Sequence, residues 1–205
     1  MIDRLNVETS AFHADADVGR DALFQDDFTP RSYRDFLTTT YGFETPLETA
    51  LALSAQLDQL LDLKARARGH LIAQDLMRLG LRASTVAELP MCLTVPSFRS
   101  AAEALGWMYV SERAALAHQV ARRHLLSRFP TELTCASNYL EAGGGLLGQR
   151  WRQFGAVLDQ ISEHPAVAER VVGAAHDAFR CFIRWTTRGK PIVRRPSGAH
   201  RVIVA

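Results

Sequence analysis

The stretch P-A-V-A-E-R-V-V-G-A-A-H-D-A-F-R-C-F-I (165–183) decides the fold class of this chain. Its apolar residues recur every three or four positions, which is the spacing of one face of an α-helix. Pro165 stands at the expected first turn, where its missing N–H costs no hydrogen bond. The stretch therefore predicts a long amphipathic helix with one buried face, made by Val167, Val171, Val172, Ala175, Phe179, Phe182 and Ile183.

Helical spacing also dominates the rest of the chain, and strand patterns are nearly absent. Thr29 and Pro30 predict a helix start, and Pro46 should kink or restart that helix. Gly80 predicts the end of another helix, because glycine readily adopts the left-handed conformation found there. We predict an all-α, single-domain bundle of about seven to eight helices. Besides the helices already described, it should have helices at residues 3–17, 64–79, 97–129, 136–142 and 147–161 and a loop over residues 81–96.

The composition is that of a globular protein, with 205 residues of which 47% are hydrophobic and 22% charged. No segment approaches the roughly 20 apolar residues of a membrane-spanning helix, and residues 1–20 show no secretory signal. Three cysteines without a CxxC spacing (Cys92, Cys135 and Cys181) argue against a disulfide framework or a cysteine zinc site. We therefore expect a soluble, cytoplasmic protein without a membrane partner.

Basic residues gather at the C-terminal end of the chain. Seven Lys or Arg residues and no acid follow Asp177, although the net charge of the whole chain is only +2. We predict a domain over residues 1–188 and a basic tail over residues 189–205. The tail could bind a protein partner or an anionic ligand, or it could be a solvated extension. No aromatic residue follows Trp185 to stack on bases, so we expect no nucleic-acid partner.

The local pattern makes His13 a candidate ligand for a metal. Asp17 follows one helical turn later, and a carboxylate at that spacing can accept the Nδ1–H of the imidazole. The Nε2 atom would then be free to bind the metal. The alternative is an ordinary surface histidine whose pairing with Asp17 contributes roughly a few tenths of a kcal/mol.

Four segments carry a resemblance to a known family. They are V-E-T-S-A-F-H-A-D-A-D (7–17), R-G-H-L-I-A-Q-D-L-M-R-L-G (68–80), L-G-W-M-Y-V-S-E (105–112), and W-R-Q-F (151–154) together with residues 165–179. In this order they resemble the heme oxygenase family, in particular the bacterial enzymes that make biliverdin. The third segment, which leads into the distal helix of that family, is the most specific. The resemblance implies a heme oxygenase-like helical bundle over nearly the whole chain.

The resemblance also implies roles for residues around a bound heme. His13 would be the axial ligand of the heme iron, donated by the first helix. Ser10 and Asn6 share its helical face and would lie beside the edge of the macrocycle, with Arg4 as the nearest base. Arg152 resembles the family's base for a heme propionate, since a guanidinium can hold a carboxylate with two hydrogen bonds. The alternative for Arg152 is an exposed position on an amphipathic helix.

The chain departs from the family at the distal helix, over S-E-R-A-A-L-A-H-Q-V (111–120). The family has a glycine-rich segment there, which approaches the heme and lets the helix bend. Here Arg113 stands where a glycine is expected, and Ala117 and His118 replace a glycine pair. We expect a stiffer helix, with Arg113, Ala114, Ala117 and His118 as candidates for the distal wall. His118 could bind the iron as a sixth ligand, or it could point to solvent or to a neighbouring helix. Arg113 could turn outward.

The resemblance implies oxidative cleavage of heme to biliverdin, carbon monoxide and iron. Heme would be both substrate and cofactor, and an external reductase would supply the electrons. The loss of the distal glycines leaves a second interpretation open, in which the chain binds heme, a bilin or a protein partner without turnover. A third interpretation makes the basic tail an interaction module.

Overall fold

The computed structural model describes residues 1–188 as a bundle of helices, with no strand in that range. Seven of its helices have ten or more residues: α2 (Ser10–Asp21), α3 (Pro30–Ala52), α6 (Gly69–Arg78), α8 (Ala101–Ala115), α9 (His118–Arg128), α12 (Leu147–Ile161) and α13 (Pro165–Thr186). The all-α prediction is confirmed, and these long helices agree with the expected count. The predicted basic tail, residues 189–205, lies outside the described residues.

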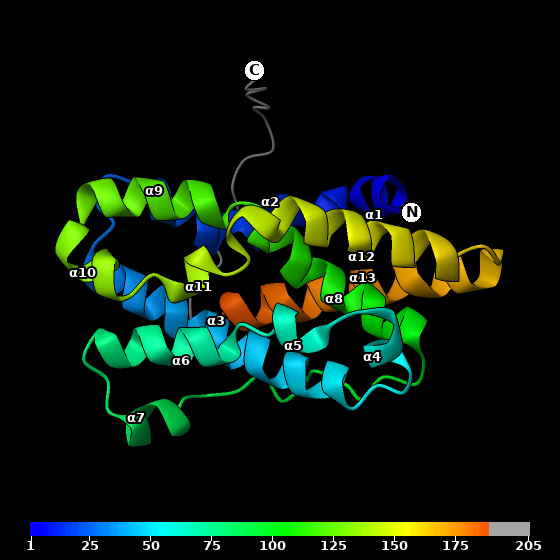
Figure 1. Ribbon diagram of the computed structural model, residues 1–205, viewed down its shortest axis with the longest axis horizontal. Coiled ribbons are helices and arrows are strands. Elements are labelled where there is room, and N and C mark those ends of the chain that lie inside the picture. The colour runs from blue at the N-terminus through cyan, green and yellow to red at the C-terminus, as the bar shows by residue number, and fades with distance from the viewer. Residues whose placement is uncertain (189–205) are drawn as a thin grey trace, which may run out of the picture.

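Short segments connect the long helices. They are α1 (Ile2–Glu8), η1 (Ala22–Phe24), α4 (Leu57–Leu60), α5 (Leu63–Arg66), α7 (Ala83–Ala87), α10 (Pro130–Cys135), α11 (Asn138–Glu141) and η2 (Gly144–Leu146). Figure 1 shows α6 and α9 at one end of the molecule, while α12 and α13 extend to the other end. No helix in the described part of the chain combines the length and the apolar character needed to span a membrane.

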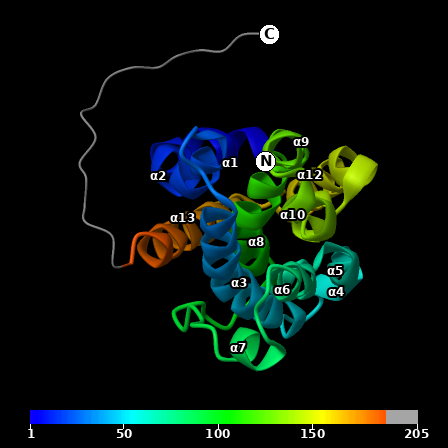
Figure 2. The same ribbon diagram turned by 90° about the vertical axis from the view of Figure 1, so that its left-hand side faces the viewer.

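Helix α8 forms the centre of the bundle. Figure 2 shows it between α2, α3, α12 and α13, and eleven of its fifteen residues are buried. It packs closely along α13, whose predicted apolar face is buried at Val171 and Phe179. A methyl group at Gly106 would collide with the carbonyl oxygen of Val171 and the side chain of Ala174. Gly106 is therefore needed for the backbones of α8 and α13 to approach each other.

Helix α3 runs through Pro46 without restarting. Its start is the predicted one, because the Thr29 hydroxyl accepts a hydrogen bond of 3.1 Å from the N–H of Ser32. A proline lacks the N–H that would bond to the carbonyl four residues earlier, here that of Gly42. In the structure the Gly42 carbonyl accepts instead from the N–H of Cys92, at 2.7 Å. The loop before α8 thus replaces the missing hydrogen bond, and the expected restart of the helix is wrong.

The first predicted helix, residues 3–17, is divided into α1 and α2. Thr9 stands between them, and its buried hydroxyl donates a hydrogen bond of 2.7 Å to the carbonyl of Leu5. A hydroxyl that bonds one turn back competes with the helical backbone for this carbonyl, which favours a bend. The division gives α2 a course of its own along α13.

The second predicted helix, residues 64–79, is divided into α5 and α6. The Glu48 carboxylate accepts from the N–H of Gly69 at 3.0 Å and so caps a new helix start at that point. The predicted end at Gly80 is confirmed, because this glycine has a φ of 94° and its N–H bonds to the carbonyl of Met77. This geometry is the common left-handed termination of a helix.

The long helix predicted over residues 97–129 is divided into α8 and α9. It also starts later than expected, because Ser100 rather than Ser97 caps it by accepting from the N–H of Glu103 at 3.3 Å. The loop predicted over residues 81–96 contains the short helix α7.

Asp75 on α6 fixes the position of α11. Its carboxylate is fully buried and accepts hydrogen bonds from the N–H groups of Asn138 at 3.0 Å and Tyr139 at 2.8 Å. These N–H groups lie at the start of a helix, where no backbone acceptor is available. Asp75 therefore satisfies the first turn of α11 and holds Tyr139 against the core.

Candidate functional site

A cavity of about 490 Å³, here called the first cavity, lies between α2, α3, the α8–α9 junction, α11 and α13. This volume is in the range of sites for small molecules. Asp15, Asp27 and Asp35 contribute exposed carboxylates to its rim. Its inner walls are mainly apolar and include Phe28, Phe36, Phe43, Val110, Phe179 and Phe182.

The wall made by α8 and α9 is bent and carries small side chains. At the junction the N–H groups of Leu116 and Ala117 bond to carbonyls three residues earlier instead of four, at 3.3 Å each. Such bonds tighten the last turn of a helix and allow a change of direction. The bend therefore forms without glycine, and the stiffness expected of this segment stays a prediction. The small side chains that line the cavity here are Ala114, Ala117 and Ala121.

His13 lies on α2 immediately before the part of this helix that lines the cavity, which begins at Asp15. It is half-buried, and its ring centroid is 5.5 Å from that of Phe179. Its Nε2 atom is 3.0 Å from the Thr9 hydroxyl oxygen. Burial, and next the positive charge of Arg113, lower the pKa of His13 below its usual value. The imidazole is therefore neutral at neutral pH, which is the form that binds a metal.

An ion pair links the helix of His13 to α8. Arg113 donates two hydrogen bonds of 2.9 Å to the two carboxylate oxygens of Asp17, and Arg20 lies 2.5 Å from the same carboxylate. Burial would raise the pKa of Asp17, but the two arginines hold it below its usual value. The predicted hydrogen bond from His13 to Asp17 is therefore replaced by the arginine contacts. Arg113 turns toward α2 rather than outward.

His118 is buried at the start of α9 and lines the first cavity. Its ring centroid lies 4.5 Å from that of Tyr139, and its Nδ1 atom has no hydrogen-bond partner among residues 1–188. Burial lowers the pKa of His118 to about 3, so the ring is neutral. Of the orientations that the sequence left open, the structure shows contact with a neighbouring helix.

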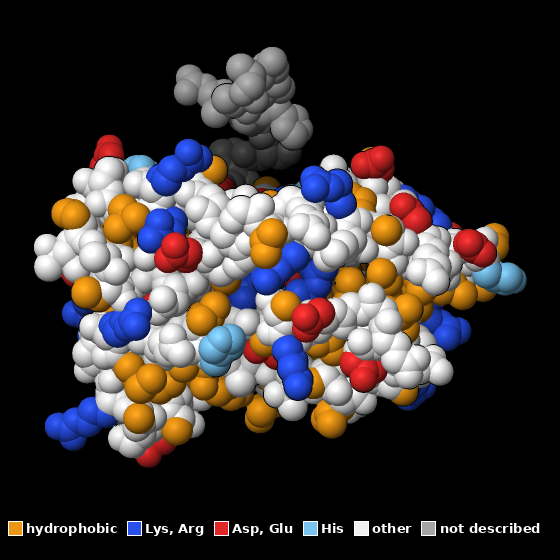
Figure 3. All heavy atoms as spheres, viewed as in Figure 1, with side chains coloured by type: hydrophobic (Ala, Val, Ile, Leu, Met, Phe, Trp, Pro, Cys, Tyr) orange, Lys and Arg blue, Asp and Glu red, His pale blue; other side chains and the backbone are white. Residues whose placement is uncertain are grey.

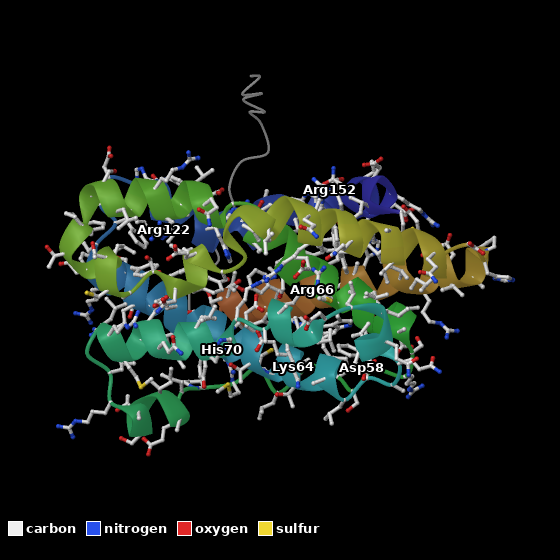
Figure 4. All side chains as sticks on the ribbon, in the orientation of Figure 1. Asp58, Lys64, Arg66, His70, Arg122 and Arg152 are labelled. Atoms are coloured by element: carbon white, nitrogen blue, oxygen red, sulfur yellow. The ribbon has the colours of Figure 1, made fainter. Side chains whose placement is uncertain are left out.

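The other residues predicted around a heme lie away from the first cavity. Ser10 and Asn6 are exposed, and the Ser10 hydroxyl bonds to the carbonyl of Val7. Arg4 pairs with glutamates, one of them Glu8 at 2.6 Å. Arg152 is exposed on α12, and Figure 4 shows it on the side of this helix next to α1. Their predicted contacts with heme stay predictions.

Glu44 on α3 lines the first cavity and was missed by the sequence analysis. Its side chain is only 6% exposed. Burial raises the pKa of Glu44 from 4.5 to about 7, although Arg68 nearby lowers it. The sequence signal for Glu44 was an acid beside Phe43 on the helical face that also carries Leu47. Acids are rarely buried unless they are paired, so an acid on an apolar face is a candidate functional residue.

The fold and the site together define an all-helical protein that can hold a largely apolar molecule beside a neutral histidine. A family model described as heme oxygenase matches residues 1–188, and the chain belongs to the heme oxygenase family. A search among curated proteins found no match.

Heme is the substrate of this family, and two features of the first cavity suit it. The apolar walls and the small side chains of the α8–α9 bend can contact a flat macrocycle. The neutral imidazole of His13, on α2 just before the part of this helix that lines the cavity, can bind iron. One feature opposes entry, because the Arg113–Asp17 pair joins the two helices that would hold the macrocycle.

Proposed function

We propose that this chain binds heme in the first cavity, with His13 as the axial ligand of the iron. The observation that carries the proposal is the position of a neutral histidine next to an apolar cavity that the small-residue bend of α8 and α9 also lines. On binding, Nε2 of His13 would give up its contact with the Thr9 hydroxyl. Thr9 would keep its hydrogen bond to the Leu5 carbonyl.

The reaction that fits family membership is oxidative cleavage of the bound heme to biliverdin, carbon monoxide and iron, with electrons from an external reductase. When bound, heme supplies the redox chemistry of the reaction, including the chemistry with oxygen. The chain orients the macrocycle through His13 and excludes water with its aromatic walls. Arg113, Ala114, Ala117 and His118 form the distal wall in this proposal. The unpartnered Nδ1 of His118 can accept a hydrogen bond from a molecule in the cavity.

A second candidate function is heme or bilin binding without turnover. The observation that favours it is the Arg113–Asp17 pair, which places a charged bridge beside His13. A ligand that cannot open this bridge would be held away from His13.

A heme titration of the purified protein tests the proposal, with His13→Ala as the variant. His70→Ala is the matched control, because His70 is an exposed histidine on α6 (Figure 4) that does not line the first cavity. We expect saturable one-to-one binding with a Soret band that is shifted or lost in His13→Ala and unchanged in His70→Ala. An identical band in all three proteins would overturn the assignment of His13.

Turnover is then tested in the same sample by adding ascorbate or a reductase under oxygen. Formation of biliverdin supports the enzymatic function. A stable heme spectrum under these conditions, with His13 confirmed as the ligand, would favour binding without turnover.

A further inference from the structure

A second cavity, of about 310 Å³, lies on the other side of Glu44, between α3, α5 and α8. Glu44 and Ser111 line both cavities. The Glu44 side chain is nearly inaccessible to solvent, so its carboxyl group belongs to the wall that separates the two spaces. A proton can therefore reach the Glu44 carboxyl group from one cavity and be released into the other cavity.

The second cavity reaches the protein surface. Thr49 and Lys64 line it and are exposed. Figure 3 shows basic side chains in a hollow between α12 and α5, where Figure 4 labels Arg66, with Lys64 nearby. The cavity has room for several water molecules. Its lining is mainly apolar, and Glu44, Thr49 and Lys64 are among the polar side chains that reach it. Glu44 is therefore within reach of bulk protons even when a ligand fills the first cavity.

The charged groups around Glu44 form ion pairs and hydrogen bonds with partners other than Glu44. Arg68 donates to Glu112 at 2.5 Å and to the carbonyl of Ser111 at 3.0 Å. Arg66 also pairs with Glu112, while Glu48 accepts from backbone N–H groups at the start of α6. No ion pair of Glu44 occurs within residues 1–188.

This environment leaves Glu44 close to the balance between its two protonation states. Burial is the largest influence and raises its pKa to about 7; the charge of Arg68 opposes this, and the charges of Glu48 and Glu112 add to it. A group with a pKa near the working pH gives and takes protons most effectively. A carboxyl group fixed in an ion pair would lack this property.

We propose that Glu44 passes protons from the second cavity to the inner end of the first cavity during heme degradation. The inference rests on the proposed function, because cleavage of heme reduces oxygen and takes up protons as the reductase supplies electrons. For each proton that Glu44 releases into the first cavity, it takes one from water in the second. The carboxyl group thus returns to its starting state and is not consumed.

The titration of Glu44 is tested first on the heme-free protein by infrared difference spectroscopy. We expect a protonated carboxyl band that disappears as the pH rises through about 7. Glu44→Gln should lack this band. Asp58→Asn, which removes an exposed acid on α4, should retain it. A wild-type protein without the band, or a band that persists in Glu44→Gln, would overturn the proposal irrespective of any enzymatic activity.

Single-turnover kinetics with heme then test the transfer. Glu44→Gln should slow biliverdin formation by about a hundredfold or more, the lower end of what general acid catalysis contributes. It should also alter the pH profile and the effect of D₂O. Glu44→Asp should recover part of the rate. Ala67→Leu should slow the reaction by narrowing the second cavity, with heme affinity unchanged.

The outcomes separate the two proposals. A wild-type protein that forms no biliverdin contradicts the enzymatic function, and the role of Glu44 is lost with it. A wild-type protein that is active, with Glu44→Gln equally fast and equally dependent on pH, contradicts the role of Glu44 alone.

Discussion

Replacing Arg113 by alanine should tighten heme binding. Arg113 and Asp17 are joined by two hydrogen bonds of 2.9 Å between α8 and α2, and their side chains are only 19% and 15% exposed. In the proposed complex, a macrocycle bound to His13 would occupy the space between these two helices, so the wild-type protein would first have to open the pair. Arg20 stays beside Asp17 in the variant, and no buried charge is left alone.

The magnitude follows from the geometry of the pair. Hydrogen bonds between charged groups contribute about 1.5–3 kcal/mol, and the partial exposure of this pair argues against a larger value. Since about 1.4 kcal/mol corresponds to a factor of ten, Arg113→Ala should lower the heme Kd roughly 10- to 100-fold. Asp17→Asn should have an effect of the same sign. The double variant should gain little beyond either single variant, because both remove the same contact.

The assay is a heme titration followed by the Soret absorbance, at low and at high salt. Arg123→Ala is the control, because it removes the same charge from an exposed position on α9. Salt should narrow the difference between wild type and Arg113→Ala, since it weakens the partly exposed pair. A Kd for Arg113→Ala that equals or exceeds the wild-type value would refute the reasoning. Arg113 would then hold the ligand instead of obstructing it.

Four further changes test the cavity and the packing. The wild-type free energy of unfolding should fall by up to about 3 kcal/mol as the pH rises from 4.5 to about 7, because the folded state binds the Glu44 proton more tightly than the unfolded state does. Glu44→Gln should abolish this fall, which urea unfolding at several pH values measures. His118→Gln should reduce the fall in the free energy of unfolding between pH 6.5 and about 3, because over this range the imidazole of His118 takes up a proton only in the unfolded chain. The same unfolding series, extended to acid, measures this. Gly106→Ala should lower the free energy of unfolding by about 1–3 kcal/mol through collision with α13, as seen in the unfolding midpoint. Asp75→Ala should cost about 2–4 kcal/mol by leaving two N–H groups of α11 without an acceptor, and hydrogen exchange at Tyr139 should report the loss.

Much of the fold could be predicted because local patterns determine it. The periodicity of residues 165–183 gave α13, and Thr29 and Gly80 marked a true start and a true end. The breaks inside the long patterns were not predictable in the same way. The continuity through Pro46 depends on a hydrogen bond between Gly42 and Cys92, which are 50 residues apart in the sequence. Spacing along one segment carries no information about such a partner.

The site could be predicted only in part, for the same reason. The segment around residues 111–120 indicated the cavity wall, and its side chains do line the first cavity. Asp17 was assigned to His13 because the two share a helix, whereas the structure gives it to Arg113, 96 residues away. Glu44 was overlooked because burial, which decides its chemistry, is a property of the assembled bundle.

Burial and ion pairing divide the wall of the first cavity into two electrostatic regions. At its inner end Glu44 and His118 are both driven toward their neutral forms, since burial raises the pKa of an acid and lowers that of a base. At the junction of α2 and α8, by contrast, Asp17 keeps its charge because Arg113 and Arg20 both pair with its carboxylate. Burial is the largest influence that lowers the pKa of His13, and Arg113 comes next. Opening this pair would take Arg113 away from His13, while Arg20 would stay beside Asp17. A ligand that separates the two helices would thus meet a more basic imidazole. In the proposed complex, access to the cavity and the basicity of His13 therefore depend on the same contact.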